Sequence, residues 1–87
     1  MRIRNFIWTP DNITHIARHG IDPLEAEEAC YRDPLVLKGP SGRYYVLGRT
    51  EVGRFLFVVV AQREKGSAYI ITAREMTASE RRRYERK

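Results

Sequence analysis

An unbroken apolar run in the second half of the chain organises the rest of the sequence. Residues 55–61 read Phe-Leu-Phe-Val-Val-Val-Ala, rich in β-branched and aromatic side chains. A strand with one face in water alternates apolar and polar positions, whereas a strand covered on both faces does not. Gly53 before the run and the polar residues 62–67 after it limit the run to strand length. The pattern predicts a central strand over 54–61, covered on both faces.

Shorter apolar stretches on either side of this run predict the remaining strands. Residues 35–37, 43–49 and 68–74 are apolar or aromatic, and turn residues separate them. Because these strands follow one another through short connections, we expect them to pair antiparallel. Residues 2–8 alternate loosely and predict a short edge strand.

The first helix is predicted from its start and stop signals. Thr9 precedes Pro10, which suits an N-cap followed by proline at the first helical position. Gly20 is expected to end the helix in the left-handed conformation. The residues expected to face the core, at helical spacing, are Ile13, Ile16 and Ala17.

Two further helices begin with a capping box, in which the N-cap residue and a glutamate three positions later exchange hydrogen bonds. The first box is Asp22 with Glu25, and that helix is expected to stop before Pro34. Its expected apolar face is Leu24, Ala26, Ala29 and Cys30. The second box is Thr77 with Glu80, and it opens a strongly basic helix.

Together these elements predict an α+β fold in one domain spanning residues 1–87. Two N-terminal helices are expected on one face of an antiparallel four- to five-stranded sheet, followed by a basic C-terminal helix. No run of 18 apolar residues occurs, and the first residues lack the apolar segment of a signal peptide, so we expect a cytoplasmic protein. Cys30, the single cysteine, is expected to be a small core residue.

The net charge of +5 is unevenly distributed along the chain. Residues 1–40 carry 5 basic and 6 acidic side chains, a balance of −1, whereas residues 41–87 carry 11 basic and 5 acidic, a balance of +6. Of the 16 basic residues, 13 are arginines, whose planar guanidinium binds phosphate through two hydrogen bonds. The second half therefore forms either a solubilising face or a surface for a polyanion.

Arg49 and Arg54 flank the turn over residues 50–53. We expect the hairpin to place them nearly opposite each other, which destabilises like charges unless an anion lies between them. The alternatives are a phosphate between the two guanidiniums or two side chains that splay into water. Arg63 and Arg74 lie on the neighbouring connections, which favours the phosphate.

Arg74 ends the last predicted strand, where strand parity places it on the face of Ile70 and Thr72. It is expected to pair with an acid such as Glu75 or Glu80, or to line a site. Tyr84 is the main apolar residue of the last predicted helix, so it either anchors that helix or brings its phenol to a substrate.

His15 and His19 are four residues apart on one helical face, a spacing that can hold a metal ion. The sequence suggests no third ligand, so a helix cap or an acid near a phosphate remain alternatives for His19. There is no Ser-His-Asp set, phosphate-binding glycine loop or nucleotide fingerprint. The inventory of Arg, His and Tyr is compatible with metal-independent RNA cleavage, in which guanidiniums stabilise the charge that builds on the phosphate.

The order of several motifs from Phe6 to Tyr84 resembles the BrnT-type toxins. These motifs are Phe6-x-Trp8, Arg18-His19-Gly20-Ile21, Asp33-Pro34, Gly48-Arg49, Gly53-Arg54, and Ile70-Ile71-Thr72-Ala73-Arg74 followed by Glu80 and Tyr84. The sequence departs from the family pattern at His15, where Asn is expected, and at Thr72, where Ser is commoner. The loop over residues 39–42 is also short.

The resemblance implies a toxin of a type II toxin–antitoxin system with a RelE-like fold and no cofactor or metal. Such a toxin is an endoribonuclease that arrests growth, and a DNA-binding antitoxin neutralises it and represses the shared promoter. The catalytic candidates by resemblance are His19, Arg54, Arg74, Glu80 and Tyr84. The RNA-binding candidates are Arg49, Arg63, Arg81 and Arg82.

Two other functions stay open at this stage. The first is a catalytically silent RNA- or antitoxin-binding domain of the same fold, and the second is a metal-dependent enzyme that uses His15 and His19. From the charge of the second half, we also expect the antitoxin to place carboxylates over Arg49, Arg54 and Arg74.

Overall fold

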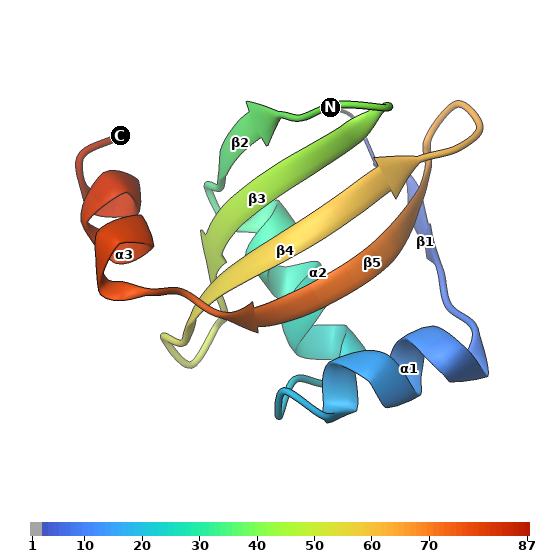
Figure 1. Cartoon of the computed structure of the whole chain (residues 1–87), viewed down its shortest axis with the longest axis horizontal. Helices are drawn as coiled ribbons and strands as arrows, with labels where there is room; N and C mark the ends of the chain where they lie inside the picture. Colours follow the sequence, from blue (N-terminus) through green and yellow to red (C-terminus); the bar gives the residue numbers. More distant parts are fainter. Residues whose placement is uncertain (1–2) are drawn as a thin grey trace.

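The computed structural model describes residues 3–87 and contains one five-stranded sheet with three helices (Figure 1). In chain order the elements are β1 (Asn5–Ile7), α1 (Pro10–Ala17), α2 (Pro23–Tyr31), β2 (Leu35–Lys38), β3 (Arg43–Arg49), β4 (Phe55–Gln62), β5 (Ser67–Glu75) and α3 (Ala78–Glu85). The α+β prediction is confirmed. The edge strand predicted over 2–8 is shorter than expected, and its first residue lies outside the described residues.

The strand order is β1-β5-β4-β3-β2, with β4 in the middle as predicted. The pairs from β2 to β5 are antiparallel, but β1 runs parallel to β5, with Asn5 opposite Ser67 and Ile7 opposite Tyr69. The sheet is therefore mixed, and the prediction of a purely antiparallel sheet is wrong for β1. No hairpin joins β1 to β5, so nothing in the connection fixes their relative direction.

The two faces of β4 differ in how completely they are covered. Leu56, Val58 and Val60 are fully buried in the core, against α1 and α2. Phe55 and Phe57 on the opposite face are only half-buried, because α3 packs against one end of the sheet alone (Figure 1). The prediction that β4 is covered on both faces therefore holds only in part, since Val59 on this second face is buried but Phe55 and Phe57 are not. Its missing alternation reflects an apolar surface that lies partly open; we call it the open face.

Close packing of α2 on β3 depends on one glycine. A Cβ atom at Gly48 would lie 1.9 Å from the backbone oxygen of Ala29. Ala26, Ala29 and Cys30 present small side chains on the buried side of α2, as the sequence predicts. Leu24 was expected there too, but it is 65% exposed because it lies at the start of the helix, beyond the sheet.

Fewer of the predicted residues of α1 face the core than expected. Ile16 is fully buried, whereas Ile13 is 41% exposed and Ala17 is exposed. Asn12 takes the expected place of Ile13, and its amide donates a hydrogen bond of 2.6 Å to the carbonyl of Ile70. The helix meets β5 along the line of positions 12 and 16, one turn apart, so Ile13 points to the side.

The predicted helix signals are confirmed. The Thr9 side chain accepts a hydrogen bond of 3.2 Å from the backbone N–H of Asn12, and both capping boxes are formed. Helix α1 ends at Ala17, earlier than expected, and Gly20 closes the following turn with a φ of +75°. Among residues 3–87, no helix is long and apolar enough to cross a membrane.

Strand β5 contains an irregularity that changes which residues share a face. Val59 pairs with Thr72 and Val60 pairs with Ile70, which leaves Ile71 without a partner. An extra residue of this kind shifts the alternation of the strand by one position. Parity therefore fails across it, and the prediction that Arg74 and Ile70 share a face is wrong. Ile70 is in the core, whereas Arg74 lies opposite Phe57 on the open face.

Candidate functional site

Four arginines gather where β3 ends, β4 begins and β5 leads into α3. We call Arg49, Arg54, Arg74 and Arg81 the arginine cluster. Two rings of β4 organise it: the guanidiniums of Arg49 and Arg81 lie over Phe55 at 5.0 and 3.9 Å from its centroid. The guanidinium of Arg74 lies over Phe57 at 4.3 Å. Cation–π contacts thus hold three positive charges at one end of the open face.

Of the two alternatives that the sequence left open for Arg74, the structure shows the pairing with an acid. Its Nη1 and Nη2 donate to the two carboxylate oxygens of Glu80 at 2.8 and 2.9 Å, and Nη1 also donates to the carbonyl of Glu75 at 3.1 Å. Glu80 also accepts from the Thr77 amide at 2.9 Å, so one carboxylate serves both the helix cap and the ion pair. The Arg74 hydrogen bond lowers the pKa of Glu80, which keeps the carboxylate ionised at neutral pH.

Arg54 is also paired with carboxylates. Its Nη1 donates to Glu25 at 2.7 Å and to the carbonyl of Gly20 at 3.1 Å, and its Nη2 lies 3.4 Å from Glu75. The hydrogen bond that Arg54 donates to Glu25 raises the pKa of Arg54 further above its ordinary value. Arg54 and Arg81 line a hollow of about 430 Å³.

The predicted opposition of Arg49 and Arg54 is wrong. The residue opposite Arg49 is Phe55, and the Thr50 amide donates to the carbonyl of Arg54 at 2.9 Å. The two arginines are thus offset by one position, which sends their side chains to opposite faces. Arg49 lies over Phe55, and Arg54 turns towards Glu25 on α2.

Tyr84 anchors α3 to the rest of the molecule. It is 8% exposed, its ring meets Phe55 edge-on with centroids 6.0 Å apart, and its hydroxyl donates to the carbonyl of Asp33 at 3.2 Å. Lys87 strengthens the same attachment through a contact of 2.6 Å with the Asp33 carboxylate. Of the two roles predicted for Tyr84, these contacts correspond to the anchor of the last helix.

The other candidates lie outside the arginine cluster. His19 is in the turn after α1. The link to Arg54 in this turn is made by the neighbouring residue, Gly20, whose carbonyl accepts a hydrogen bond from Arg54. Arg63 lies over Tyr69 at 5.2 Å, at the opposite end of β4, and Arg82 is exposed on α3. The structure thus brings Arg49, Arg74, Glu80 and Arg81 together on the open face and places Arg54 at the same end of the sheet, on the side of α2. His19, Arg63 and Arg82 lie apart from them.

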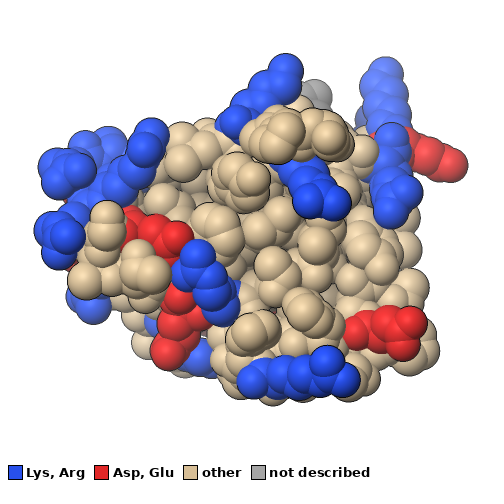
Figure 2. All heavy atoms as spheres, in the orientation of Figure 1, with Lys and Arg blue, Asp and Glu red and all other residues tan. Residues whose placement is uncertain are grey.

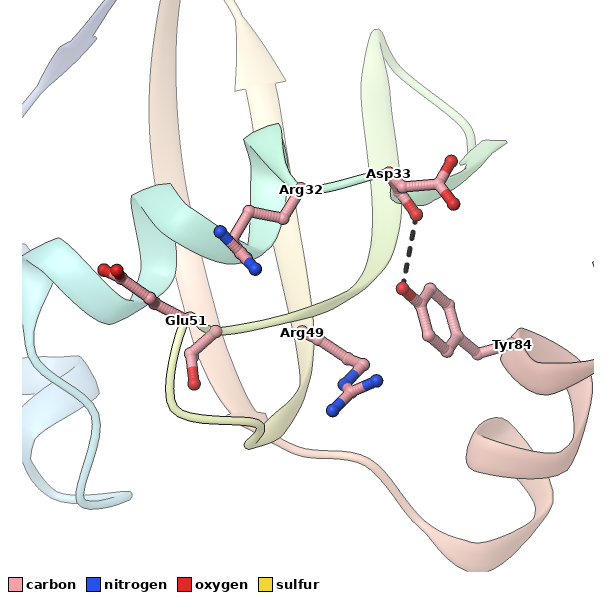
Figure 3. Close-up of a pocket in the computed structure, with 6 residues that line it drawn as sticks. Arg32, Asp33, Arg49, Glu51 and Tyr84 are labelled. Atoms are coloured by element: carbon pink, nitrogen blue, oxygen red, sulfur yellow. Dashed lines mark hydrogen bonds between the residues drawn. The ribbon is translucent and has the colours of Figure 1, made fainter.

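A second hollow, of about 440 Å³, lies between the end of α2, the turn after β3, and α3 (Figure 3). Arg32 and Arg49 line it together with Asp33, Thr50, Glu51 and Tyr84. Arg32 was not among the predicted site residues, because its position between α2 and Asp33-Pro34 is typical of a residue that ends a helix. The signal that could have found it is the same position, next to Asp33.

Basic side chains dominate the α3 end of the open face. Figure 2 shows Lys and Arg gathered over α3, whereas the sheet beside it is mostly uncharged. This arrangement is typical of a surface that attracts a polyanion at one end and offers apolar contacts next to it.

Comparison with known proteins identifies the family. A family model described as "Ribonuclease toxin, BrnT, of type II toxin-antitoxin system" matches residues 8–80. The chain belongs to the BrnT toxin family. The crystal structure of the Brucella abortus ribonuclease toxin BrnT is similar at 22% sequence identity, with a TM-score of 0.66 over 88% of this chain and 97% of that one. A comparison with curated proteins found no match.

Membership confirms the resemblance given by the sequence motifs, and the ribonuclease toxins of this family work with an antitoxin partner. His15 and Thr72, the two positions expected to depart from the family pattern, meet in space. The Nε2 atom of His15 lies 3.1 Å from the hydroxyl oxygen of Thr72, within hydrogen-bond distance. These two side chains therefore form a contact between α1 and β5.

The histidine pair lacks a complete set of metal ligands. The rings of His15 and His19 lie edge-on with centroids 5.6 Å apart. Within the described part of the chain, no group of three or more His, Cys, Asp or Glu side chains is placed to hold a metal ion. Cys30 is buried, and burial raises the pKa of its thiol to about 12, so it is unreactive at neutral pH.

Proposed function

We propose that this BrnT toxin is a cytoplasmic, metal-independent endoribonuclease that binds the RNA backbone with the arginine cluster. The observation that carries the proposal is the set of three guanidiniums over Phe55 and Phe57 at one end of an open, apolar sheet face. Guanidiniums bind phosphates, and guanidinium planes or exposed rings stack with unpaired bases. A single-stranded RNA therefore finds both kinds of contact on this face.

The proposed reaction is attack of a ribose 2′-hydroxyl on the adjacent phosphorus. The O2′–P bond forms as the P–O5′ bond breaks, a base takes the proton of the 2′-hydroxyl, and an acid supplies one to the 5′ oxygen. Negative charge builds on the phosphoryl oxygens, and Arg54 and Arg74 supply the opposing charge. His19 is our candidate for a proton transfer, because histidine is the side chain that most often serves as a general acid or base.

Glu80 and Tyr84 act in this scheme as positioning residues. The lowered pKa of Glu80 keeps it ionised, so it holds Arg74 in place and donates no proton. The Tyr84 hydroxyl already donates to Asp33, and its ring holds α3, which carries Arg81, against Phe55. Both residues thus fix the guanidiniums that face the substrate.

Growth arrest and RNA cleavage test the proposal together. The chain is induced alone in a bacterial host beside Arg74→Ala and the control Arg43→Ala, an exposed arginine on the same sheet. Purified proteins are then incubated with RNA in excess chelator, after circular dichroism has shown that each is folded. We expect arrest and chelator-resistant cleavage by the parent and the control, and loss of both in Arg74→Ala. A folded Arg74→Ala that still arrests growth and cleaves RNA contradicts the proposal.

For the antitoxin, we propose a DNA-binding partner that places carboxylates over Arg49, Arg54 and Arg74 and represses the shared promoter. The positive balance of residues 41–87 supports this, as does the family membership. We also propose that the fold is of the RelE-like kind. The complex is expected to weaken as salt increases, because added ions screen exposed charges. Equal affinity at low and high salt would argue against a carboxylate-based contact.

A catalytically silent binding domain is the second candidate. It is favoured by the carboxylates already paired with Arg54 and Arg74, which a substrate phosphate has to displace or share. RNA affinity without cleavage or growth arrest by the folded parent would select this function.

A further inference from the structure

Arg32 and Arg49, which line one hollow, differ from the nearby Arg54 and Arg74 in that, within the described chain, they are not paired with an acid. Arg54 and Arg74 each lie within 2.8 Å of a carboxylate oxygen. Among residues 3–87, by contrast, no carboxylate forms an ion pair with Arg32 or Arg49, and neither guanidinium donates a hydrogen bond. Two positive side chains thus share one hollow of about 440 Å³, and neither is paired with an acid among the described residues.

The acids that line this hollow do not neutralise it. The Asp33 carboxylate is 2.6 Å from the ammonium of Lys87, so the charge of this acid is already balanced. Figure 3 shows the Glu51 carboxylate pointing away from both guanidiniums. The remaining lining groups are the buried Thr50 and the ring of Tyr84. An incoming anion therefore meets two unpaired guanidiniums, whereas one lining carboxylate is paired with Lys87 and the other points away.

We propose that this hollow binds a backbone phosphate of the RNA, held by Arg32 and Arg49, next to the site of cleavage. This inference rests on the proposed function. The observation that favours RNA is continuity: Arg49 lines the hollow and also lies over Phe55, the ring that it shares with Arg81 of the neighbouring hollow. A polymer with a phosphate on every nucleotide can occupy both hollows at once. Arg32 thereby extends the RNA path from the sheet to the end of α2.

The test measures how RNA affinity depends on salt. A fluorescent single-stranded RNA with 2′-O-methyl groups throughout is used, because it lacks the attacking hydroxyl and stays intact during binding. Affinity is measured by anisotropy over a range of salt concentrations for the parent, Arg32→Ala, Arg32→Gln, Arg49→Ala and the double variant. The matched control is Arg43→Ala, which removes the same charge from the opposite end of the strand that carries Arg49.

Each lost phosphate contact on a single strand lowers the slope of log affinity against log salt by about 0.7. We expect that decrease, with weaker binding, for each variant at Arg32. Arg49→Ala should lose at least as much, because Arg49 also contributes to the arginine cluster. Arg43→Ala should keep the slope of the parent. Arg32 and Arg49 are exposed, and circular dichroism verifies that the variants are folded.

The outcomes separate this inference from the function on which it rests. If the parent binds the RNA and the variants at Arg32 keep its slope, the phosphate site is wrong while RNA binding stands. If these variants bind RNA like the parent but lose affinity for the antitoxin, the hollow binds the protein partner instead, which also overturns the inference. A folded parent without affinity for the RNA overturns both proposals.

Discussion

The ion pair between Arg74 and Glu80 gives a measurable contribution to stability. We consider Glu80→Gln, which removes the charge but keeps an amide oxygen that can accept from the Thr77 amide. The Glu80 side chain is 24% exposed and that of Arg74 is 38% exposed. A surface salt bridge stabilises a protein by about 0.2–1 kcal/mol, and a hydrogen bond to a charged group by about 1.5–3 kcal/mol. The stabilisation by a pair of this exposure is expected to lie between these values. We expect a loss of about 1–2 kcal/mol at neutral pH.

Urea unfolding of four proteins isolates the pair: the parent, Arg74→Ala, Glu80→Gln and the double variant. We expect a coupling free energy of about 1 kcal/mol between the two substitutions, since the second removes an interaction already lost. The matched control is Glu85→Gln on the same helix, whose partner Arg81 lies 3.6 Å away with both side chains 54% exposed. Its effect should stay within about 0.5 kcal/mol.

The contribution of the Glu80 carboxylate to stability should depend on pH in a definite direction. The pKa of Glu80 in the folded chain lies below its ordinary value of 4.5. Its contribution is therefore complete above pH 4.5 and is lost as the pH falls through the lower, folded-state pKa. The stability difference between parent and Glu80→Gln should shrink in that acidic window. Additive effects of the two substitutions, or a difference that is unchanged in strong acid, would refute the reasoning.

Three further predictions concern the core and the attachment of α3. Gly48→Ala should lower the free energy of unfolding by about 3 kcal/mol or more, since the new methyl group would lie 1.9 Å from the Ala29 oxygen; a thermal melt like that of the parent would contradict this. Cys30, with a pKa of about 12, should stay unmodified by a thiol reagent at pH near 8 until denaturant is added; rapid modification of the folded protein would contradict its burial. Tyr84→Phe should lose about 1 kcal/mol in urea unfolding, because only the hydrogen bond to Asp33 is removed; unchanged stability would show that this bond contributes nothing.

The sequence predicted those parts of the fold that depend on local signals. The N-caps at Thr9, Asp22 and Thr77 each rest on residues within one helical turn, and all three form as expected. The parallel pairing of β1 with β5 could not be predicted in this way. It depends on contacts between residues 62 positions apart, for which no turn chemistry gives a signal.

The candidate site was only partly predictable for a related reason. Glu80 was one of the two acids suggested as partners of Arg74, and it lies only six residues away along the chain. The separation of Arg49 from Arg54 depends on the register of one hairpin, where a shift of a single residue moves a side chain to the other face. Arg32 enters its hollow only through packing of α2 beside the turn after β3, which the pattern of apolar residues does not reveal.

The pairing of β1 with β5 also bears on when the protein becomes active during its synthesis. Asn5 is made early, but its partner Ser67 is added only after β2, β3 and β4. Such distant pairing delays folding, because a long loop must close before the contact forms. Arg81 is added later still, and it completes the arginine cluster over Phe55. A ribosome that carries the unfinished chain, surrounded by RNA, thus holds no assembled arginine cluster until nearly the whole sequence has emerged.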